Sequence, residues 1–391
     1  MDRFEQQIAE HETSLESLFS ACEKLNEIAQ VAQESLKDGG LHPTALPYCN
    51  IALESYGGVA LEDSALMTLP RQQTTGDVVK AAVEGVKKVL QHIFEMIKKM
   101  WSWIVDHAKA LVSRTAALTV KAKELAEKAK DYSGVVEKVS VIEDSQLVHR
   151  LAWGKRGVNY NFEDGLHFYQ HAVEEVSGLV VADGAKMAAA LLHAFQIVVE
   201  LKPREEYSID SSFVIERIPG YHTEVSQHVG EVPIHFHASP LLPGNGQIWI
   251  FSVGRRGVRT TGAHALKAIG KTGIVVLDDK KSSEESGTDL KVQTLSDISA
   301  ACQGVADLSK TIETVLNKST PSLNRALAVS KTAENFIGMS GSPHAVDMAQ
   351  ALRAINNFAS RGHVIVCNRA FSYASAVYQH CLASYNAQVK V

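Results

Sequence analysis

The stretch that decides the fold is residues 77–112, DVVKAAVEGVKKVLQHIFEMIKKMWSWIVDHAKALV. Its apolar residues recur every three or four positions, which is the period of one face of an α-helix. They are Val79, Val83, Val86, Leu90, Ile93, Ile97, Trp101, Ile104, Ala108 and Leu111. The alanine- and lysine-rich residues that follow have good helix propensity. The sequence therefore predicts a helix that continues to about Asp131, with its lysines beside the apolar stripe.

The residues before this stretch form a second helical pattern. Apolar side chains recur at helical spacing over residues 4–36, and the glycines of DGG at 38–40 are typical of a helix end. Two prolines interrupt residues 42–56, which we expect to form a short helix or turn. Residues 57–76 contain glycines, Pro70 and polar runs, so they are expected to be a linker.

The rest of the chain switches period twice. Residues 142–153 and 163–202 have helical patterns, and residues 294–388 are helical with stops expected near 318–322 and 338–343. Between them, an alternating period predicts strands at 211–218, 232–239, 247–253 and 273–279. We therefore expect an α+β fold that is mainly α-helical, with a small central, mostly antiparallel sheet.

This pattern divides the chain into five expected regions. They are an acidic helical arm (1–62), a linker (63–76), a helical domain with the long Lys/Trp helix (77–204), a small β-rich domain (205–290) and a C-terminal helical region (291–391). The arm holds eleven acidic and three basic side chains, a net charge of −8, whereas the remainder carries +3. A strongly acidic segment on a mildly basic body is typical of a detachable or masking element.

No enzyme class emerges from the motifs. Gly270-Lys271-Thr272 resembles the end of a phosphate loop, but the glycine required five positions earlier is Ala265, and a strand is expected where the loop needs a helix. His235 and His237 are expected on one face of a strand, and a hydrolytic metal site would need further ligands. We therefore expect a protein that is not an enzyme, with no cofactor and no metal, and keep a metal-dependent hydrolase using these histidines as an alternative.

Location and surface chemistry leave two further possibilities. The N-terminus lacks a secretory pattern, no apolar run is long enough to span a bilayer, and the five cysteines are scattered, so synthesis in a cytoplasm is expected. The long helix could lie on a membrane or touch DNA, and the side chains expected to make such a contact are Lys87, Lys88, Lys98, Lys99, Trp101 and Trp103. Packing within a helical bundle is the simpler interpretation.

One tripeptide occurs twice beside the expected linker, as Ala52-Leu53-Glu54 and Ala60-Leu61-Glu62. The surrounding segment, LHPTALPYCNIALESYGGVALEDS at 41–64, is followed by VKKVLQHIFEMIKKMWSWI at 86–104. With these segments the chain resembles the internal head proteins, or inner-body virion proteins, of giant tailed phages of the phiKZ kind.

The resemblance implies a virion structural protein of the head interior, made in the host cytoplasm with an N-terminal propeptide that targets it into the assembling head. In that family the prohead maturation protease cuts after a glutamate in a small-x-Glu or aliphatic-x-Glu tripeptide. The matching positions are the two Ala-Leu-Glu copies, with Ser14-Leu15-Glu16 a further match inside an expected helix. The implied partners are this protease, other head or scaffold proteins and packaged DNA, and the family allows ejection with the DNA. A membrane-active, pore-forming helical protein is the alternative from another class.

Overall fold

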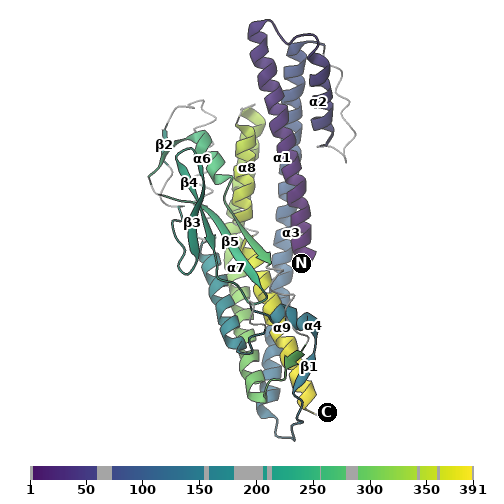
Figure 1. Cartoon of the computed structure of the whole chain (residues 1–391), viewed down its shortest axis with the longest axis vertical. Coiled ribbons are helices and arrows are strands. Elements are labelled where there is room, and N and C mark those ends of the chain that lie inside the picture. The colour runs from purple at the N-terminus through teal and green to yellow at the C-terminus, as the bar shows by residue number, and fades with distance from the viewer. Residues whose placement is uncertain are drawn as a thin grey trace.

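The computed structural model describes residues 3–59, 73–153, 158–179, 206–208, 214–255, 257–278, 289–340, 344–358 and 362–389. Figure 1 shows an elongated molecule in which long helices run along the main axis and a sheet lies to one side. The helices are α1 (Arg3–Ser35), α2 (Leu46–Val59), α3 (Thr75–Asp131), α4 (Ser145–Leu151), α6 (Gly262–Ile269), α7 (Leu295–Ser340), α8 (Ala345–Asn356) and α9 (Gly362–Gln388), with a 3-10 turn at Leu36–Asp38 and a further helix over residues 162–179. The strands are β1 (Val141–Glu143), β2 (Glu206–Ser208), β3 (His222–Val229), β4 (Val232–Ala238), β5 (Gly246–Val253), β6 (Arg259–Thr261), β7 (Gly273–Asp278) and β8 (Asp289–Lys291).

Helix α3 is the axis of the molecule. Its 57 residues give a length of about 85 Å at 1.5 Å per residue. The first turn is capped by Thr74, whose hydroxyl accepts a hydrogen bond from the Asp77 amide, while the Asp77 carboxylate accepts one from the Thr74 amide. This reciprocal cap satisfies two of the amides that a helix start leaves without partners. The prediction of a continuous helix to Asp131 is confirmed, and the helix begins two residues earlier than expected.

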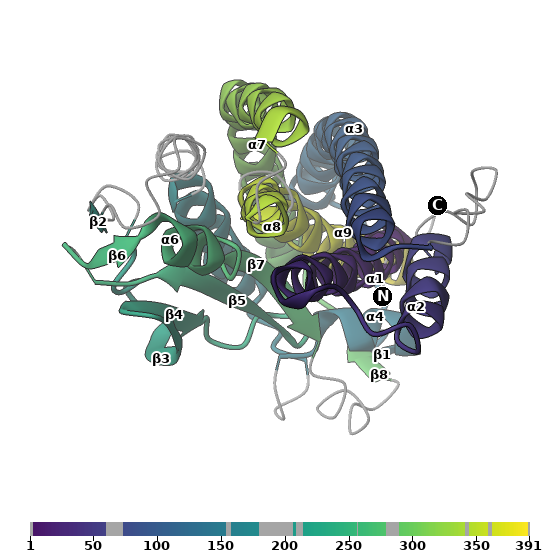
Figure 2. The same ribbon diagram turned by 90° about the horizontal axis from the view of Figure 1, so that it is seen from above.

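The apolar stripe of α3 changes neighbours along its length. Helix α1 runs antiparallel beside the first half, where Leu25 lies against Gly85 and His11 lies against Trp103. Helices α7 and α9 pack against α3 as well, and Arg114 in its second half lies over the ring of Phe371 in α9. Figure 2, seen from above, shows α1 beside both α3 and α8. The stripe is therefore covered within the chain.

The main sheet has the strand order β3-β4-β5-β7, and every neighbouring pair is antiparallel. Helix α6 packs on β3, β4 and β5, and α8 packs on α6, which ties the sheet to the helical layer. Two further pairs, β1 with β8 and β2 with β6, form short antiparallel ribbons. The expected fold class, mainly α-helical with a small antiparallel sheet, is confirmed.

Four local expectations were wrong or incomplete. Residues 214–218 are irregular rather than a strand, and β3 was not predicted. Helix α7 continues through Pro321, where a stop was expected. Helix α2 continues through Gly57 and Gly58 to Val59, so these glycines are not the start of a linker. The stop expected at 338–343 is confirmed, because α7 ends at Ser340.

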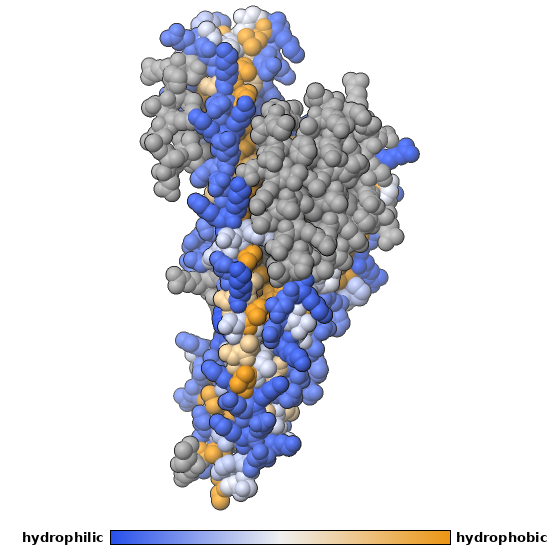
Figure 3. All heavy atoms as spheres, turned by 180° about the vertical axis from the view of Figure 1, so that it is seen from behind, coloured by the Kyte–Doolittle hydropathy of each residue, from blue (hydrophilic) through white to orange (hydrophobic). Residues whose placement is uncertain are grey.

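The face of the molecule seen from behind (Figure 3) is largely polar over the residues that the structure describes. Figure 3 shows one face of the molecule, on which apolar residues form a narrow line between wide hydrophilic areas. No helix in the described ranges combines the length and apolarity needed to cross a membrane.

Candidate processing sites and the clamp on helix α1

The first Ala-Leu-Glu copy lies in a helix and is partly buried. Ala52, Leu53 and Glu54 belong to α2, Leu53 is 1% exposed, and the Glu54 side chain is in solvent. A protease binds its substrate as an extended strand, so cutting after Glu54 requires α2 to unfold locally. The fold therefore protects this bond.

The second copy occupies a different position. Ala60, Leu61 and Glu62 lie outside the described residues, immediately after the last residue of α2 and before the cap of α3 at Thr74. A cut after Glu62 would lie in the chain between Leu46–Val59 of α2 and Thr75–Asp131 of α3.

The third match, Ser14-Leu15-Glu16, lies in the middle of α1. Leu15 is fully buried, and Ser14 donates a hydrogen bond to the Glu10 carbonyl of its own helix. Glu16 accepts a hydrogen bond from Arg353 of α8 at 3.3 Å. Helix, core and ion pair all hold this tripeptide, so its bond is the best protected of the described matches.

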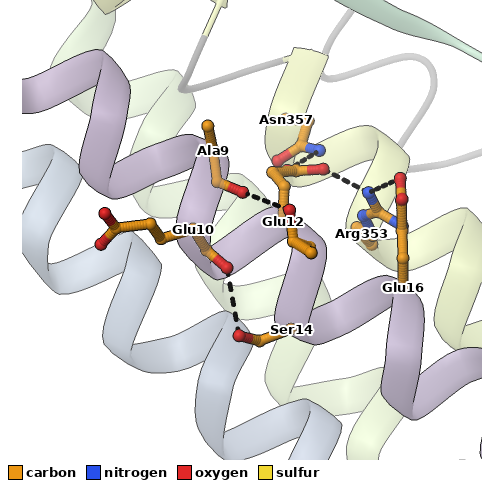
Figure 4. A network of polar contacts seen from close by, with 8 residues as sticks. Ala9, Glu10, Glu12, Ser14, Glu16, Arg353 and Asn357 are labelled. Atoms are coloured by element: carbon orange, nitrogen blue, oxygen red, sulfur yellow. Dashed lines mark hydrogen bonds and ion pairs between the residues drawn. The ribbon is translucent and has the colours of Figure 1, made fainter.

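Sequence reasoning missed the residues that hold α1 from the other side. Arg353, Asn357 and Gln350, from α8 and the residue after it, form a cluster that we call the α8 clamp. Figure 4 shows the Arg353 guanidinium between Glu12 and Glu16 of α1, donating to both carboxylates, with Asn357 beside Glu12. Asn357 Nδ2 donates to Glu12 Oε1 at 2.9 Å. Farther along α1, Gln350 Nε2 donates to Glu23 Oε1 at 3.0 Å.

The centre of the clamp is shielded from water. The Arg353 side chain is 18% exposed and the Glu12 side chain 14%, so their ion pair is less screened than a surface pair. Arg353 also lies over the ring of Phe19, 5.7 Å from its centroid. Glu16 is 70% exposed and contributes less.

Helix α1 meets α3 through apolar side chains. Leu25 is fully buried, and its Cδ1 atom lies 3.2 Å from the position that a Cβ on Gly85 would take. Cys22 is fully buried, and its thiol lies 3.9 Å from the Val86 carbonyl. The buried residues of α1 and α3 form one continuous core, so the acidic charges of the arm lie on a helix that is packed into the body.

The lysines and tryptophans of α3 are distributed over different environments. Lys87 and Lys99 are exposed, whereas Lys88 and Lys98 are half-buried and pair with Glu84 at 3.9 Å and Glu95 at 3.6 Å. Trp101 is 7% exposed and belongs to the α1–α3 contact, and Trp103 is half-buried. The apolar face of α3 that could have rested on a membrane is therefore buried within the chain.

His237 on β4 contacts side chains of both neighbouring strands, β3 and β5. His237 is fully buried, and its two ring nitrogens lie 2.9 Å from Thr223 Oγ1 and 2.8 Å from Ser252 Oγ. Burial, with a smaller contribution from His235, lowers the pKa of His237 to about 4. Within the described parts of the chain, no group of three or more His, Cys, Asp or Glu side chains could hold a metal ion. His237 makes structural hydrogen bonds here.

Comparison with known proteins shows the family of the chain. A family model for phiKZ-like phage internal head proteins matches residues 1–358. The match extends from α1 through the sheet and includes the α8 clamp, whereas α9 lies beyond it. Neither the curated proteins nor the solved structures contain a match.

Proposed function

The chain belongs to the family of phiKZ-like phage internal head proteins, and we propose that this structural protein of the virion head interior is made as a precursor and cut by the prohead maturation protease after Glu62. The position of the three tripeptides relative to the helices carries the proposal. Leu15 and Leu53 are buried within helices, whereas Ala60-Leu61-Glu62 follows the end of α2. A protease that needs an extended substrate would have to unfold part of α1 to cut after Glu16 and part of α2 to cut after Glu54, whereas Ala60-Leu61-Glu62 lies in the segment that the sequence predicts to be a linker.

Cleavage would change the charge of the body but would not by itself remove α1. Residues 1–62 carry a net charge of −8 and the remainder +3. After a cut at Glu62, α1 would still be held by its buried face on α3 and by the α8 clamp. Release of the arm is therefore a separate step, which requires the core between α1 and α3 to open.

Intact-mass and N-terminal peptide analysis of the protein from mature particles tests the cut. We expect a mature chain that begins at Asp63, and a Glu62→Gln variant that keeps its original N-terminus. A matched Glu54→Gln variant should be processed like the wild type. A mature chain that begins at Met1 or Asp2 would refute processing, and one that begins at Ser55 would move the cut to α2.

We also propose weak, non-specific contact between the long helix and packaged DNA. Residues 77–131 carry a surplus of only four positive charges, and Lys88 and Lys98 face acidic partners. We expect non-specific retention on DNA that falls steeply with salt, because binding releases counterions from the phosphates. A Lys87→Gln, Lys99→Gln double variant should flatten the slope of log affinity against log salt by about 2, and an unchanged slope would place the contact elsewhere.

A further inference from the structure

Helix α1 lies in a groove that has two different walls. The α3 wall is apolar and the α8 wall is polar, and Leu15 of α1 lines a small space together with residues of both walls. The other residues that line this space are Ile97, Met100, Trp101 and Ile104 of α3 together with Arg353 and Asn357. Such a groove selects an amphipathic helix with one apolar side and acidic residues at its edge.

Helix α1 carries the matching pattern on one face. Glu12, Leu15 and Glu16 are spaced i, i+3 and i+4, so their side chains project in the same direction. Leu15 is buried on the apolar side of the groove. The carboxylates of Glu12 and Glu16 accept hydrogen bonds from Arg353. Because Glu12 and Glu16 are one turn apart, a shift of α1 by one turn would leave only one of the two carboxylates at the Arg353 guanidinium, so the pair favours the observed position of α1 along α3.

We propose that this groove also accepts α1 of a second copy of the chain, so that neighbouring copies in the head are linked by exchanged α1 helices. Every contact between α1 and the groove joins two elements of the same sequence, so α1 from a neighbour makes the same contacts. The contacts within one chain show the complementarity of charge and shape that the exchange needs.

The chain is long enough to make the exchange without being cut. Fifteen residues separate Val59 of α2 from Thr75 of α3, and a connection of that length can reach about 50 Å when extended. The exchange therefore does not depend on cleavage after Glu62, and either proposal can fail without the other.

A crosslinking experiment between two differently marked copies tests the exchange. Both copies are full chains in a Cys49→Ser background, because Cys49 is half-buried and the other four cysteines are buried. One copy carries Glu12→Cys on α1, and the other carries Asn357→Cys in the groove. The two side chains touch in the native contact, so a short bismaleimide can join them. Neither copy holds both thiols, so only an α1 helix docked in the other copy gives the 12–357 product.

We expect a covalent heterodimer joined through positions 12 and 357, identified by its tryptic crosslinked peptide. Adding Arg353→Glu to the groove copy should reduce this product at least about tenfold, since the reversed charge repels Glu16. A single chain carrying both Glu12→Cys and Asn357→Cys is the positive control and should crosslink within itself. If that control reacts while the mixture gives no heterodimer at concentrations up to those of a packed head, the groove serves only its own α1 and the proposal is overturned.

Discussion

The two neighbours of α1 hold it by different means. On the α3 side, Leu25 and Cys22 are fully buried among apolar atoms, and Gly85 gives Leu25 room to approach the backbone. On the α8 side, Arg353, Asn357 and Gln350 bind carboxylates at the edge of solvent. Burial of apolar surface supplies free energy without fixing a position, whereas ion pairs add little energy but depend on geometry. The α3 side therefore sets how tightly α1 is held, and the α8 side sets where it sits.

The largest expected effect is on the α3 side. Replacing Leu25 with alanine leaves a cavity against Gly85, which should lower the free energy of unfolding by about 2–5 kcal/mol. Urea denaturation followed by circular dichroism measures this loss. The matched control is Val31→Ala on the same helix, because Val31 is 59% exposed and its truncation should change stability by less than about 0.5 kcal/mol. Equal effects at both positions would mean that α1 is not packed on α3.

Acid should weaken the part of the molecule that lies away from α1. His363 and His380 of α9 are buried, and burial lowers the pKa of each to about 4 from the ordinary value of 6.5. Between these two values the unfolded chain binds protons that the folded chain excludes, so stability is present above pH 6.5 and falls as the pH drops toward 4. Each histidine can cost up to about 3 kcal/mol over that window.

Chemical denaturation at a series of pH values between 7.5 and 4.5 measures this dependence. A His380→Asn variant, which removes one titrating group, should have a shallower slope than the wild type below pH 6.5. An identical slope in the two proteins would show that His380 is not held neutral in the folded state.

The sequence predicted the α3 side of this arrangement but not the α8 side. Apolar residues at helical spacing over 77–131 and 4–36 predicted both helices, because periodicity is a local property of the chain. The pairing of Arg353 with Glu12 spans 341 residues. Each partner alone has the pattern of an ordinary solvated charge, so no local signal indicated the clamp.

Local sequence patterns also failed to predict one strand of the sheet and two places where a helix continues. Strand β3 exposes most of its side chains, so it lacks the alternation that identified β4 and β5. Gly57 and Gly58 have the local preference of a linker, yet α2 continues through them to Val59 and packs on α1 and α3. Pro321 likewise did not end α7. Tertiary packing overrode local propensity at these positions.

A smaller effect is expected on the α8 side. Arg353→Gln removes the charge that faces Glu12 and Glu16, and Asn357 remains as a partner for Glu12. Because the ion pair is only partly buried, the loss should be about 1–2 kcal/mol, between the values for surface and buried pairs. Raising the salt to 1 M should shrink the difference between the two proteins, since ions screen the charges. Arg353→Lys is the matched control that keeps the charge but loses the planar fork, and it should lie between them.

Hydrogen exchange of the α1 amides separates this effect from a general loss of stability. In the Arg353→Gln variant we expect faster exchange around Glu12 and Glu16 than around Leu25, since the apolar contact with α3 remains. Uniformly faster exchange along the whole of α1 would mean that position and tightness are not set separately.

The smallest effect is expected at the N-terminal cap of α3, which follows Glu62 in the chain. The hydroxyl of Thr74 accepts from the Asp77 amide at 3.2 Å and donates to Asp77 Oδ2 at 2.7 Å. Thr74→Ala should therefore cost about 1 kcal/mol of stability and fray the first turn of α3, whereas Thr74→Ser keeps the hydroxyl and should behave like the wild type. Val78 is fully buried in that turn, and Leu25 of α1 packs against α3 at Gly85. Fraying of α3 should therefore stop before it exposes Leu25. Exchange of the amides of residues 75–78 should accelerate in the alanine variant while the amide of Val89 stays protected, and acceleration at Val89 would mean that the cap and the contact with α1 are a single cooperative unit.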